Sequence, residues 1–412
     1  MQSTERFEQV PIDKLIPYSR NARTHSKEQI LQLRSSLREF GFVNPILSDA
    51  DFNIIAGHGR ILAAKAEGFT EVPCVFVEHL TEAQKRAYTL ADNRTALSAG
   101  WDDEMLGIEM SELKDLGFDL ALTGFDNAEI EKLFGSNDVT DDDFDVDKAL
   151  EEPPFVQSGD LWTLGRHRLL CGDATKSEDV SRLMDGKRAN LVLTDPPYLI
   201  SYDKGKAGTI MNDNLDDKAG YEFILAAFRQ AESAMASDAS IYVFHADTKG
   251  ELFRRAFREA GFHLSMCCIW KKNTFTLGRT PYQFGHEPCL FGWKDSGKHF
   301  WNSDRKQNSV WEFDKPHRSE IHSTMKPVPL FGYLIGNSTM TSGVVLDLFS
   351  GSFTTGIACQ QLDRVCYAME LDPKYASASI LRFRESFPDE IISVERNGEV
   401  INFADIAKGA AQ

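Results

Sequence analysis

From about residue 159 onward, short apolar runs alternate with amphipathic helical patterns, and this alternation constrains the fold more than any other feature of the chain. The helical patterns fall near residues 218–236, 248–260, 328–337, 355–362 and 374–386. The strand-like runs lie at residues 168–171, 190–194, 240–245, 264–270, 288–293, 344–348 and 365–369. Such alternation predicts an α/β fold with an open sheet and helices on both faces, in which ligands bind at the carboxyl ends of the strands.

Residues 1–98 form a separate pattern that predicts a small α/β unit. Ser26 and Gln29 make a capping box in front of one apolar helical face, and that helix is expected to stop at Gly41. Three strands and two further helices complete the unit. The strands are expected at residues 44–48, 53–56 and 72–77, and the helices at residues 57–68 and after Thr81.

The segment between these regions carries most of the acidity of the chain. Residues 101–152 hold eighteen Asp and Glu against three Lys, so they account for −15 of the formal net charge of −17. Two short helical patterns predict a helical appendage over residues 99–135. Residues 136–158 are too charged to bury a core and are broken by prolines, so they are expected to be an acidic linker. The domain with the alternating strand and helix pattern is then expected to run from residue 159 to residue 412.

Composition limits the other possibilities. Charged residues interrupt every apolar run before it could span a bilayer, and the first residues show no secretory pattern, so no membrane partner and a cytoplasmic location are expected. The seven cysteines form no Cys-x-x-Cys pair, which favours reduced thiols and no metal. Residues 249–318 carry thirteen Lys and Arg against seven Asp and Glu, a surplus of six that could meet phosphates or form an ordinary solvated face.

The apolar run 190–194 leads directly into Asp195-Pro196-Pro197-Tyr198. Two prolines cannot continue a strand or helix, so the chain must leave the sheet in a rigid turn. A carboxylate and the carbonyl before a proline can accept the two hydrogens of an exocyclic amine, and an aromatic ring beside them can stack on a flat base. The alternative is a simple proline turn with Tyr198 as packing.

A second turn follows the apolar run 344–348. Small residues around Gly351 precede a helix, which brings backbone N–H groups toward a ligand, and Glu370 ends the next strand about twenty residues later. An acid at this spacing can accept hydrogen bonds from the two hydroxyl groups of a ribose. Taken alone, the same pattern also fits an ordinary strand–helix corner. In an open sheet this turn and the Asp195 turn can be neighbours at the switch point.

Together these elements resemble the amino-group DNA methyltransferases that use S-adenosylmethionine, in the subgroup whose Asp-Pro-Pro-Tyr tetrapeptide comes first. The resemblance covers about residues 159–388 and implies a Rossmann-like sheet, double-stranded DNA as partner and S-adenosylmethionine as cofactor; it is compatible with a homodimer. By position it implies catalytic roles for Asp195, Pro196, Pro197 and Tyr198, and cofactor roles for Asp173, Lys326, Asp347, Phe349, Gly351 and Glu370. Within it, residues 271–320 are expected to recognise the target, together with the loop 202–217.

One position departs from the family pattern. Phe353 stands where the family usually has glycine, and a ring there could crowd the cofactor or oppose a backbone angle that glycine adopts easily. We expect Phe353 to turn toward the helix packing and to leave the site intact.

Residues 8–98 resemble the ParB/sulfiredoxin-like domain. Gly57, His58 and Arg60 open a predicted helix, and an arginine beside free N–H groups favours phosphate. The catalytic cysteine of sulfiredoxins is missing, and a helix cap with a surface arginine is the alternative. Lys271 and Lys272 are the candidate DNA contacts of the second domain.

The sequence therefore predicts a DNA methyltransferase that acts on an exocyclic amine. Adenine N6 is favoured over cytosine N4 because Asp195 opens the tetrapeptide, whereas cytosine enzymes more often begin with Ser. The alternatives are an N4-cytosine enzyme, an RNA or protein methyltransferase, and a non-catalytic DNA-binding protein with a degenerate cofactor site.

Overall fold

The computed structural model describes residues 6–18, 23–95, 100–101, 103–134, 139–201, 211–276, 281–295, 297–303, 306–314 and 325–409. The chain separates into two compact units, residues 1–130 and 131–412, which are described one at a time.

The first unit contains a four-stranded sheet with the order β1-β4-β2-β3. Its strands are β1 (Arg6–Pro11), β2 (Ile46–Ser48), β3 (Ile54–Ala56) and β4 (Glu71–Phe76), and its helices include α1 (Lys27–Phe40), α2 (His58–Ala66), α3 (Glu82–Thr95) and α4 (Asp103–Asp115). The predicted caps are confirmed: Ser26 accepts from the Gln29 N–H, and α1 ends at Gly41 with φ of 70°. Leu37, Ile46 and Ile61 are among the residues of its core.

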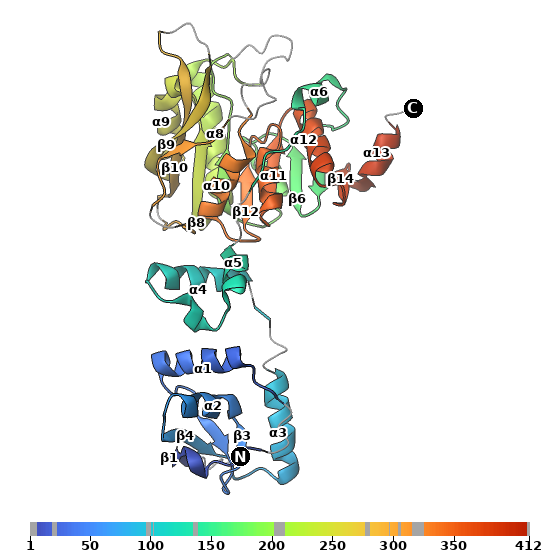
Figure 1. Cartoon of the computed structure of the whole chain (residues 1–412). Helices are drawn as coiled ribbons and strands as arrows, with labels where there is room; N and C mark the ends of the chain where they lie inside the picture. The colour runs from blue at the N-terminus through green and yellow to red at the C-terminus, as the bar shows by residue number, and fades with distance from the viewer. Residues whose placement is uncertain are drawn as a thin grey trace. The chain divides into compact units, whose positions relative to one another are not determined.

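The second unit is built on an eleven-stranded mixed sheet with the order β11-β9-β10-β8-β7-β12-β13-β6-β5-β14-β15 (Figure 1). Its strands are β5 (Leu161–Leu164), β6 (His167–Cys171), β7 (Ala189–Thr194), β8 (Met235–Phe244), β9 (Phe262–Thr276), β10 (Phe284–Lys294), β11 (Val310–Glu312), β12 (Val344–Asp347), β13 (Val365–Glu370), β14 (Ile392–Arg396) and β15 (Glu399–Asn402). The central strands β8, β7, β12, β13 and β6 are parallel to their neighbours within this group.

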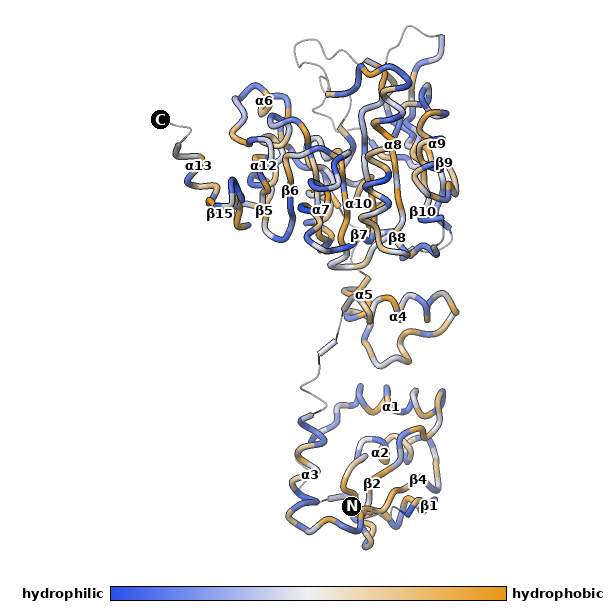
Figure 2. The backbone as a smooth tube through the Cα atoms, turned by 180° about the vertical axis from the view of Figure 1, so that it is seen from behind, coloured by the Kyte–Doolittle hydropathy of each residue, from blue (hydrophilic) through white to orange (hydrophobic). Residues whose placement is uncertain are grey.

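Helices cover both faces of this sheet, as the alternation predicts. Two separate apolar clusters lie on the two faces: one includes α10 (Val328–Ser338), α11 (Thr354–Gln361) and α12 (Pro373–Ser386), and the other includes α7 (Ser177–Met184), α8 (Asp217–Ala234) and α9 (Gly250–Glu259). Along β7, Leu191 and Leu193 enter the first cluster and Val192 the second. Because both faces are buried, the strand is continuously apolar. On α8, by contrast, hydrophobic and hydrophilic residues alternate (Figure 2).

The switch point of the sheet lies between β7 and β12. The chain passes from β7 through α8 to β8 on one side, and from β12 through α11 to β13 on the other, while β7 and β12 are hydrogen-bonded to each other. The two turns singled out in the sequence therefore leave adjacent strands at the same edge. The Rossmann-like fold class is confirmed.

The acidic run differs from its expected role as a linker. Its described residues 139–158 belong to the second compact unit and contain helix α6 (Val146–Glu151), which packs against α12. Figures 1 and 2 show α6 beside α12 from opposite sides. The preceding helix, α5 (Asn127–Phe134), spans the division between the units.

The C-terminal hairpin turns at Asn397-Gly398, where both residues adopt positive φ, and helix α13 (Phe403–Gly409) follows it. Among the described residues, no helix combines the length and apolar character needed to cross a bilayer. All seven cysteines are free thiols, and six of them are buried.

Candidate active site

A cavity of about 510 Å³ opens at the carboxyl edge of the central strands. Its wall takes residues from the turns after β6, β7, β8, β12 and β13, and from β10 and the start of α10. The predicted site residues among them are Asp173, Asp195, Pro196, Pro197, Tyr198, Lys326, Asp347, Phe349, Gly351 and Glu370. The structure thus brings together, in one cavity, the two turns that the sequence placed at one edge.

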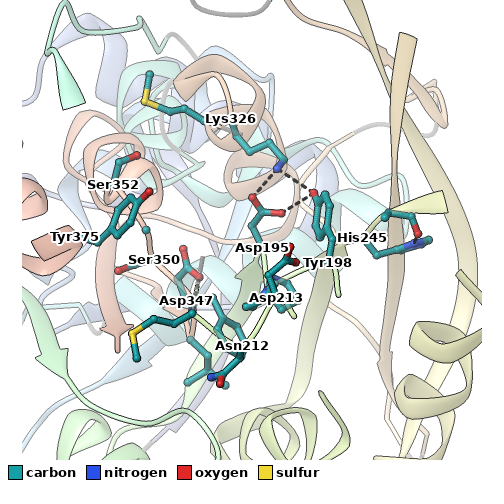
Figure 3. A pocket seen from close by; sticks show the side chains of 18 of the residues that line it. Asp195, Tyr198, Asn212, Asp213, His245, Lys326, Asp347, Ser350, Ser352 and Tyr375 are labelled. Atoms are coloured by element: carbon teal, nitrogen blue, oxygen red, sulfur yellow. Dashed lines mark hydrogen bonds and ion pairs between the residues drawn. The ribbon is translucent and has the colours of Figure 1, made fainter. Parts of the chain in front are cut away.

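The catalytic tetrapeptide is held by a lysine that enters from the start of α10. Lys326 Nζ lies 2.5 Å from Asp195 Oδ2 and 3.0 Å from the Tyr198 hydroxyl, which itself donates to Asp195 Oδ1 at 2.7 Å. Figure 3 shows the three side chains converging on one point. Lys326 is buried in this position, with only 4% of its side chain exposed.

Sequence reasoning missed a second acidic residue in this cluster. Glu287, on β10, has Oε2 3.0 Å from Lys326 Nζ and accepts from the Tyr198 hydroxyl, and its Oε1 lies 2.5 Å from Lys272 Nζ. The signal available in the sequence was a carboxylate directly before the apolar run 288–293. Asp195, Tyr198, Glu287, Lys272 and Lys326 form what we call the charge cluster.

Burial and charge act on this cluster in opposite directions. Burial alone would raise the pKa of Glu287, but the ammonium groups of Lys326 and Lys272 outweigh it and lower that pKa to about 2. Burial raises the pKa of Asp195, and the Glu287 carboxylate adds to the rise against the opposing effect of Lys326. Burial and both carboxylates raise the pKa of Tyr198, which keeps its hydroxyl protonated.

Asp347 joins the two turns. Its Oδ1 accepts from the Thr194 hydroxyl at 2.9 Å and from the Phe349 N–H at 3.1 Å, and its Oδ2 accepts from the Thr355 hydroxyl. Burial raises its pKa to about 6 despite these donors. Because Thr194 directly precedes Asp195, this buried acid fixes the catalytic turn relative to the turn after β12.

The turn after β12 is organised around Gly351 and Glu370. Gly351 has φ of 51°, and its N–H donates to Glu370 Oε2 at 2.8 Å, while the Asp372 N–H donates to Oε1 at 2.9 Å. Burial raises the pKa of Glu370 to about 7, and the two N–H donors oppose the rise. Beyond these two hydrogen bonds the carboxylate has further lone pairs, so it can also accept hydrogen bonds from hydroxyl groups of a ligand.

Phe353 points away from the cavity, as predicted. Its ring is fully buried in edge-on contact with His167 and Phe383, and a Cβ at Gly356 would lie 2.1 Å from its Cε1. The residue adopts φ of 68° as the N-cap of α11. A non-glycine residue in this region carries strain of about 1–2 kcal/mol, which burial of a whole phenyl ring offsets.

The cavity wall has polar atoms that fit an adenosyl ligand. Ser350 Oγ is buried without a hydrogen-bond partner in the described part of the chain. Figure 3 places Ser350, Ser352 and Tyr375 together on the side away from Tyr198. Asp173 lines the same cavity, although its Oδ1 accepts from the Thr175 N–H and hydroxyl.

The predicted phosphate-binding groups lie elsewhere. In the first unit, Arg60 donates to the carbonyls of Asn44 and Pro45, and His58 Nε2 accepts from the Tyr18 N–H. Gly57 adopts φ of 102° at the start of α2. Arg60 thus already binds the chain's own carbonyls, and phosphate binding there stays a prediction.

The two lysines predicted to contact DNA have different environments. Lys271 is exposed and paired with Glu312 at 2.8 Å. Lys272 is only 6% exposed and lies against Glu287, so the expectation that its ammonium faces DNA phosphates is corrected. Parts of the predicted recognition segments, residues 202–210, 277–280, 296, 304–305 and 315–320, lie outside the described residues.

Family comparisons agree with this architecture. A DNA methylase family matches residues 189–381, and a ParB N-terminal domain matches residues 1–94. The chain therefore carries a DNA methylase domain and an N-terminal ParB domain. Between the two parts, residues 104–158 match a ParB-methyltransferase HTH domain. This one family segment overlaps both the helical appendage expected at residues 99–135 and the acidic linker expected at residues 136–158.

Individual relatives of the DNA methylase match its two halves separately. The ParB-like nuclease domain-containing protein YnaK of Escherichia coli is 47% identical over 76 residues, which are 18% of this chain and 87% of YnaK. Type II methyltransferase M.HpaI of Haemophilus parainfluenzae is 24% identical over 243 residues, 53% of this chain and 75% of that enzyme.

Solved structures also resemble the methylase. PvuII DNA methyltransferase (cytosine-N4-specific) is 17% identical, with a TM-score of 0.44 over 60% of this chain and 92% of that one. The M1.HpyAVI–SAM complex is 19% identical, with a TM-score of 0.40 over 52% of this chain and 97% of that one. The match to the DNA methylase family, rather than these structures, identifies the protein as a DNA amino-methyltransferase with S-adenosylmethionine as its cofactor.

Proposed function

We propose that this methylase transfers a methyl group to adenine N6 in double-stranded DNA. The observation that carries the proposal is the shared cavity in which Asp195 and Tyr198 face the turn around Gly351. The preference for adenine rests on Asp195 as the first residue of the tetrapeptide. Cytosine N4 is the alternative target, because the same arrangement can hold either exocyclic amine.

Several wall residues are suited to hold the cofactor. Glu370 can accept from the two ribose hydroxyls, the orphaned Ser350 Oγ can donate to or accept from the ligand, and Phe349 and Asp173 flank the same space. When bound, S-adenosylmethionine supplies an electrophilic methyl group. We assign Lys326 to the catalytic turn rather than to the methionine end of the cofactor, because its ammonium contacts Asp195, Glu287 and Tyr198.

The chain's own residues then orient the amine. A target base reaches this cavity only when it leaves the duplex. Asp195 and the Pro196 carbonyl accept the two amine hydrogens, which directs the nitrogen lone pair, and the Tyr198 ring offers a stacking face. Lys326 and the Tyr198 hydroxyl hold the Asp195 carboxylate in place through both oxygens. Rate enhancement therefore comes from positioning, which is worth several orders of magnitude when reacting atoms are aligned.

Nucleoside mass spectrometry after methylation of unmodified DNA tests the target. N6-methyladenine is expected, and N4-methylcytosine alone would contradict the adenine proposal while leaving the reaction class intact. Asp195→Ala should bind S-adenosylmethionine with nearly unchanged affinity in calorimetry but lose transfer of a tritiated methyl group. Retained transfer would overturn the assignment of Asp195.

A further inference from the structure

Residues 139–152, which we call the acidic strap, lie against the helices α10, α11 and α12. The strap contains Asp141, Asp142 and helix α6, and it belongs to the same compact unit as the methyltransferase sheet. We propose that the strap is part of the cofactor site, and that Asp142, acting through Arg382, sets the affinity for S-adenosylmethionine. The inference rests on the cofactor residues assigned under the proposed function.

The first step is the ion pair between the strap and α12. Arg382 is 1% exposed, and its Nε lies 2.8 Å from Asp142 Oδ2, whose side chain is 14% exposed. Among the described residues, Asp142 is the acid that forms an ion pair with Arg382. A buried guanidinium needs such a counter-charge, because removing one partner leaves the other charge uncompensated.

The second step leads from Arg382 to the cofactor turn. Arg382 Nη1 donates to the Ser352 carbonyl at 2.9 Å, to the Ser352 hydroxyl at 3.2 Å and to the Thr354 hydroxyl at 3.0 Å. Ser352 and Thr354 line the cavity on either side of Phe353, the residue with strained positive φ. Asp142 thus orients Arg382, and Arg382 holds the backbone segment that must present Gly351 to the ligand.

The third step is that strap residues line the cavity and form a hydrogen bond with the helix beside it. Asp141 Oδ1 accepts from the Val328 N–H at 2.7 Å, at the start of the helix that places Phe331 in the cavity wall. Val146, on α6, is 6% exposed and lines the cavity itself. The strap therefore lines the cavity through Val146, and Asp141 and Asp142 bind buried groups that support the cavity wall.

A glycine in α10 gives room for the strap. A Cβ at Gly332 would lie 2.4 Å from Val139 Cγ2 and 2.8 Å from Val139 Cβ. Because the second atom is close to the backbone of Val139, a side chain at position 332 must displace the strap rather than turn a flexible group aside. The pair Gly332 and Val139 offers a way to move the strap without changing Asp142 or Arg382.

Calorimetric titration of the full chain with S-adenosylmethionine is the test. Asp142→Asn is expected to raise the Kd about tenfold, since supporting residues of this kind shift coupling by this order. In steady-state assays the KM for S-adenosylmethionine should rise in parallel, while kcat changes by less than about threefold. Asp389→Asn, an equal loss of charge at an exposed residue after α12 and outside the strap, is the matched control and should bind like the wild type. Binding by Asp142→Asn equal to that of the wild type would overturn the inference.

A second pair of variants keeps the test valid if Asp142→Asn folds poorly. Gly332→Ala should weaken S-adenosylmethionine binding by displacing Val139, and Val139→Gly combined with Gly332→Ala should restore it, because this change removes the Cβ of Val139 as well as its methyl groups. Failure of the double variant to recover affinity, or unchanged binding by Gly332→Ala, would argue that the strap does not act on the site. A wild type that fails to bind would instead refute the cofactor assignment itself, so the two failures are distinguishable.

Discussion

The turn after β7 and the turn after β12 leave adjacent strands and line the same cavity, but they are stabilised in different ways. The catalytic turn depends on charged side chains from distant segments: Lys326 before α10, and Glu287 with Lys272 from the β9–β10 pair. The turn around Gly351 depends on hydrogen bonds instead. Gly351 forms hydrogen bonds with Glu370 and Ser379, and Asp347 accepts hydrogen bonds from both Phe349 and Thr355.

The difference teaches how each half of the site should respond to change. A cluster of two ammonium groups and two carboxylates is balanced, so removing one charge disturbs the rest. A turn held by hydrogen bonds and packing should instead be disturbed by loss of the Phe353 ring. It should also respond to protonation of Glu370, whose carboxylate accepts two backbone N–H groups. The following predictions separate the two modes, from the largest expected effect to the smallest.

Lys326→Met should be the most damaging single change. It leaves Asp195 and Glu287 as neighbouring buried carboxylates without Lys326, which costs about 3–5 kcal/mol of the free energy of unfolding. Methyl transfer should be lost with it. Urea unfolding measures the first effect and tritiated methyl transfer the second. Lys176→Met, at an exposed lysine, is the control. A stable Lys326→Met protein would mean that the cluster does not need its central charge.

Phe353→Gly should destabilise the protein even though it introduces the residue usual in the family. Loss of a buried ring costs about 3–5 kcal/mol, while relief of the positive φ returns about 1–2, so a net loss of about 1–4 kcal/mol is expected. Denaturant unfolding tests this sum. Improved stability would show that the backbone strain outweighs the packing against His167 and Phe383.

Glu287→Gln should lower kcat while leaving the Kd for S-adenosylmethionine within about twofold of the wild type. The amide keeps the shape of the side chain but leaves Lys272 and Lys326 with one carboxylate less, which misplaces Asp195 and Tyr198. A loss of about 10–100-fold in kcat is expected for a change of this kind. Single-turnover kinetics with saturating cofactor would reveal it, and an unchanged rate would remove Glu287 from the site.

The affinity for S-adenosylmethionine should rise with pH. Ribose hydroxyls donate to the ionised form of Glu370, so binding favours loss of its proton, and with a ligand-free pKa of about 7 the affinity increases as pH passes upward through this value. Between pH 6 and 8 the gain is about tenfold. Titration calorimetry at pH 6, 7 and 8 checks it, and Glu370→Gln should flatten the profile. A profile identical in both proteins would assign the titration to another group.

Lys271→Glu should have the smallest effect. Its exposed ammonium is offset by Glu312, so loss of one phosphate contact is expected to weaken DNA binding several-fold and to reduce the slope of log affinity against log salt by about one. Fluorescence anisotropy at several salt concentrations measures the slope. An unchanged slope would place the DNA path away from this lysine.

Local patterns predicted most of the fold and the main features of the site. Caps and strand runs are set by neighbouring residues, so α1 and β7 appear where the sequence placed them. Glu287 could not be found in this way, because it lies 89 residues from Tyr198 along the chain and only the pairing of β10 with β8 brings it near.

The acidic segment shows the opposite limit. Its composition favours a solvated linker, since charges without partners cannot be buried. Its partners exist but are remote: Arg382 lies 240 residues from Asp142, and the Val328 N–H lies 187 residues from Asp141. Composition describes the charge of the segment, whereas burial depends on which groups the fold brings to it.

The amino-acid sequence alone determined that a parallel-stranded sheet forms and that two reactive turns end its strands, because hydrophobic period and proline or glycine geometry act over a few residues. Only the tertiary structure decided which charges surround Asp195, where the ring of Phe353 points and what the acidic strap touches. These depend on contacts between segments far apart in the chain, whose energies are set by burial and by the exact distance between opposite charges.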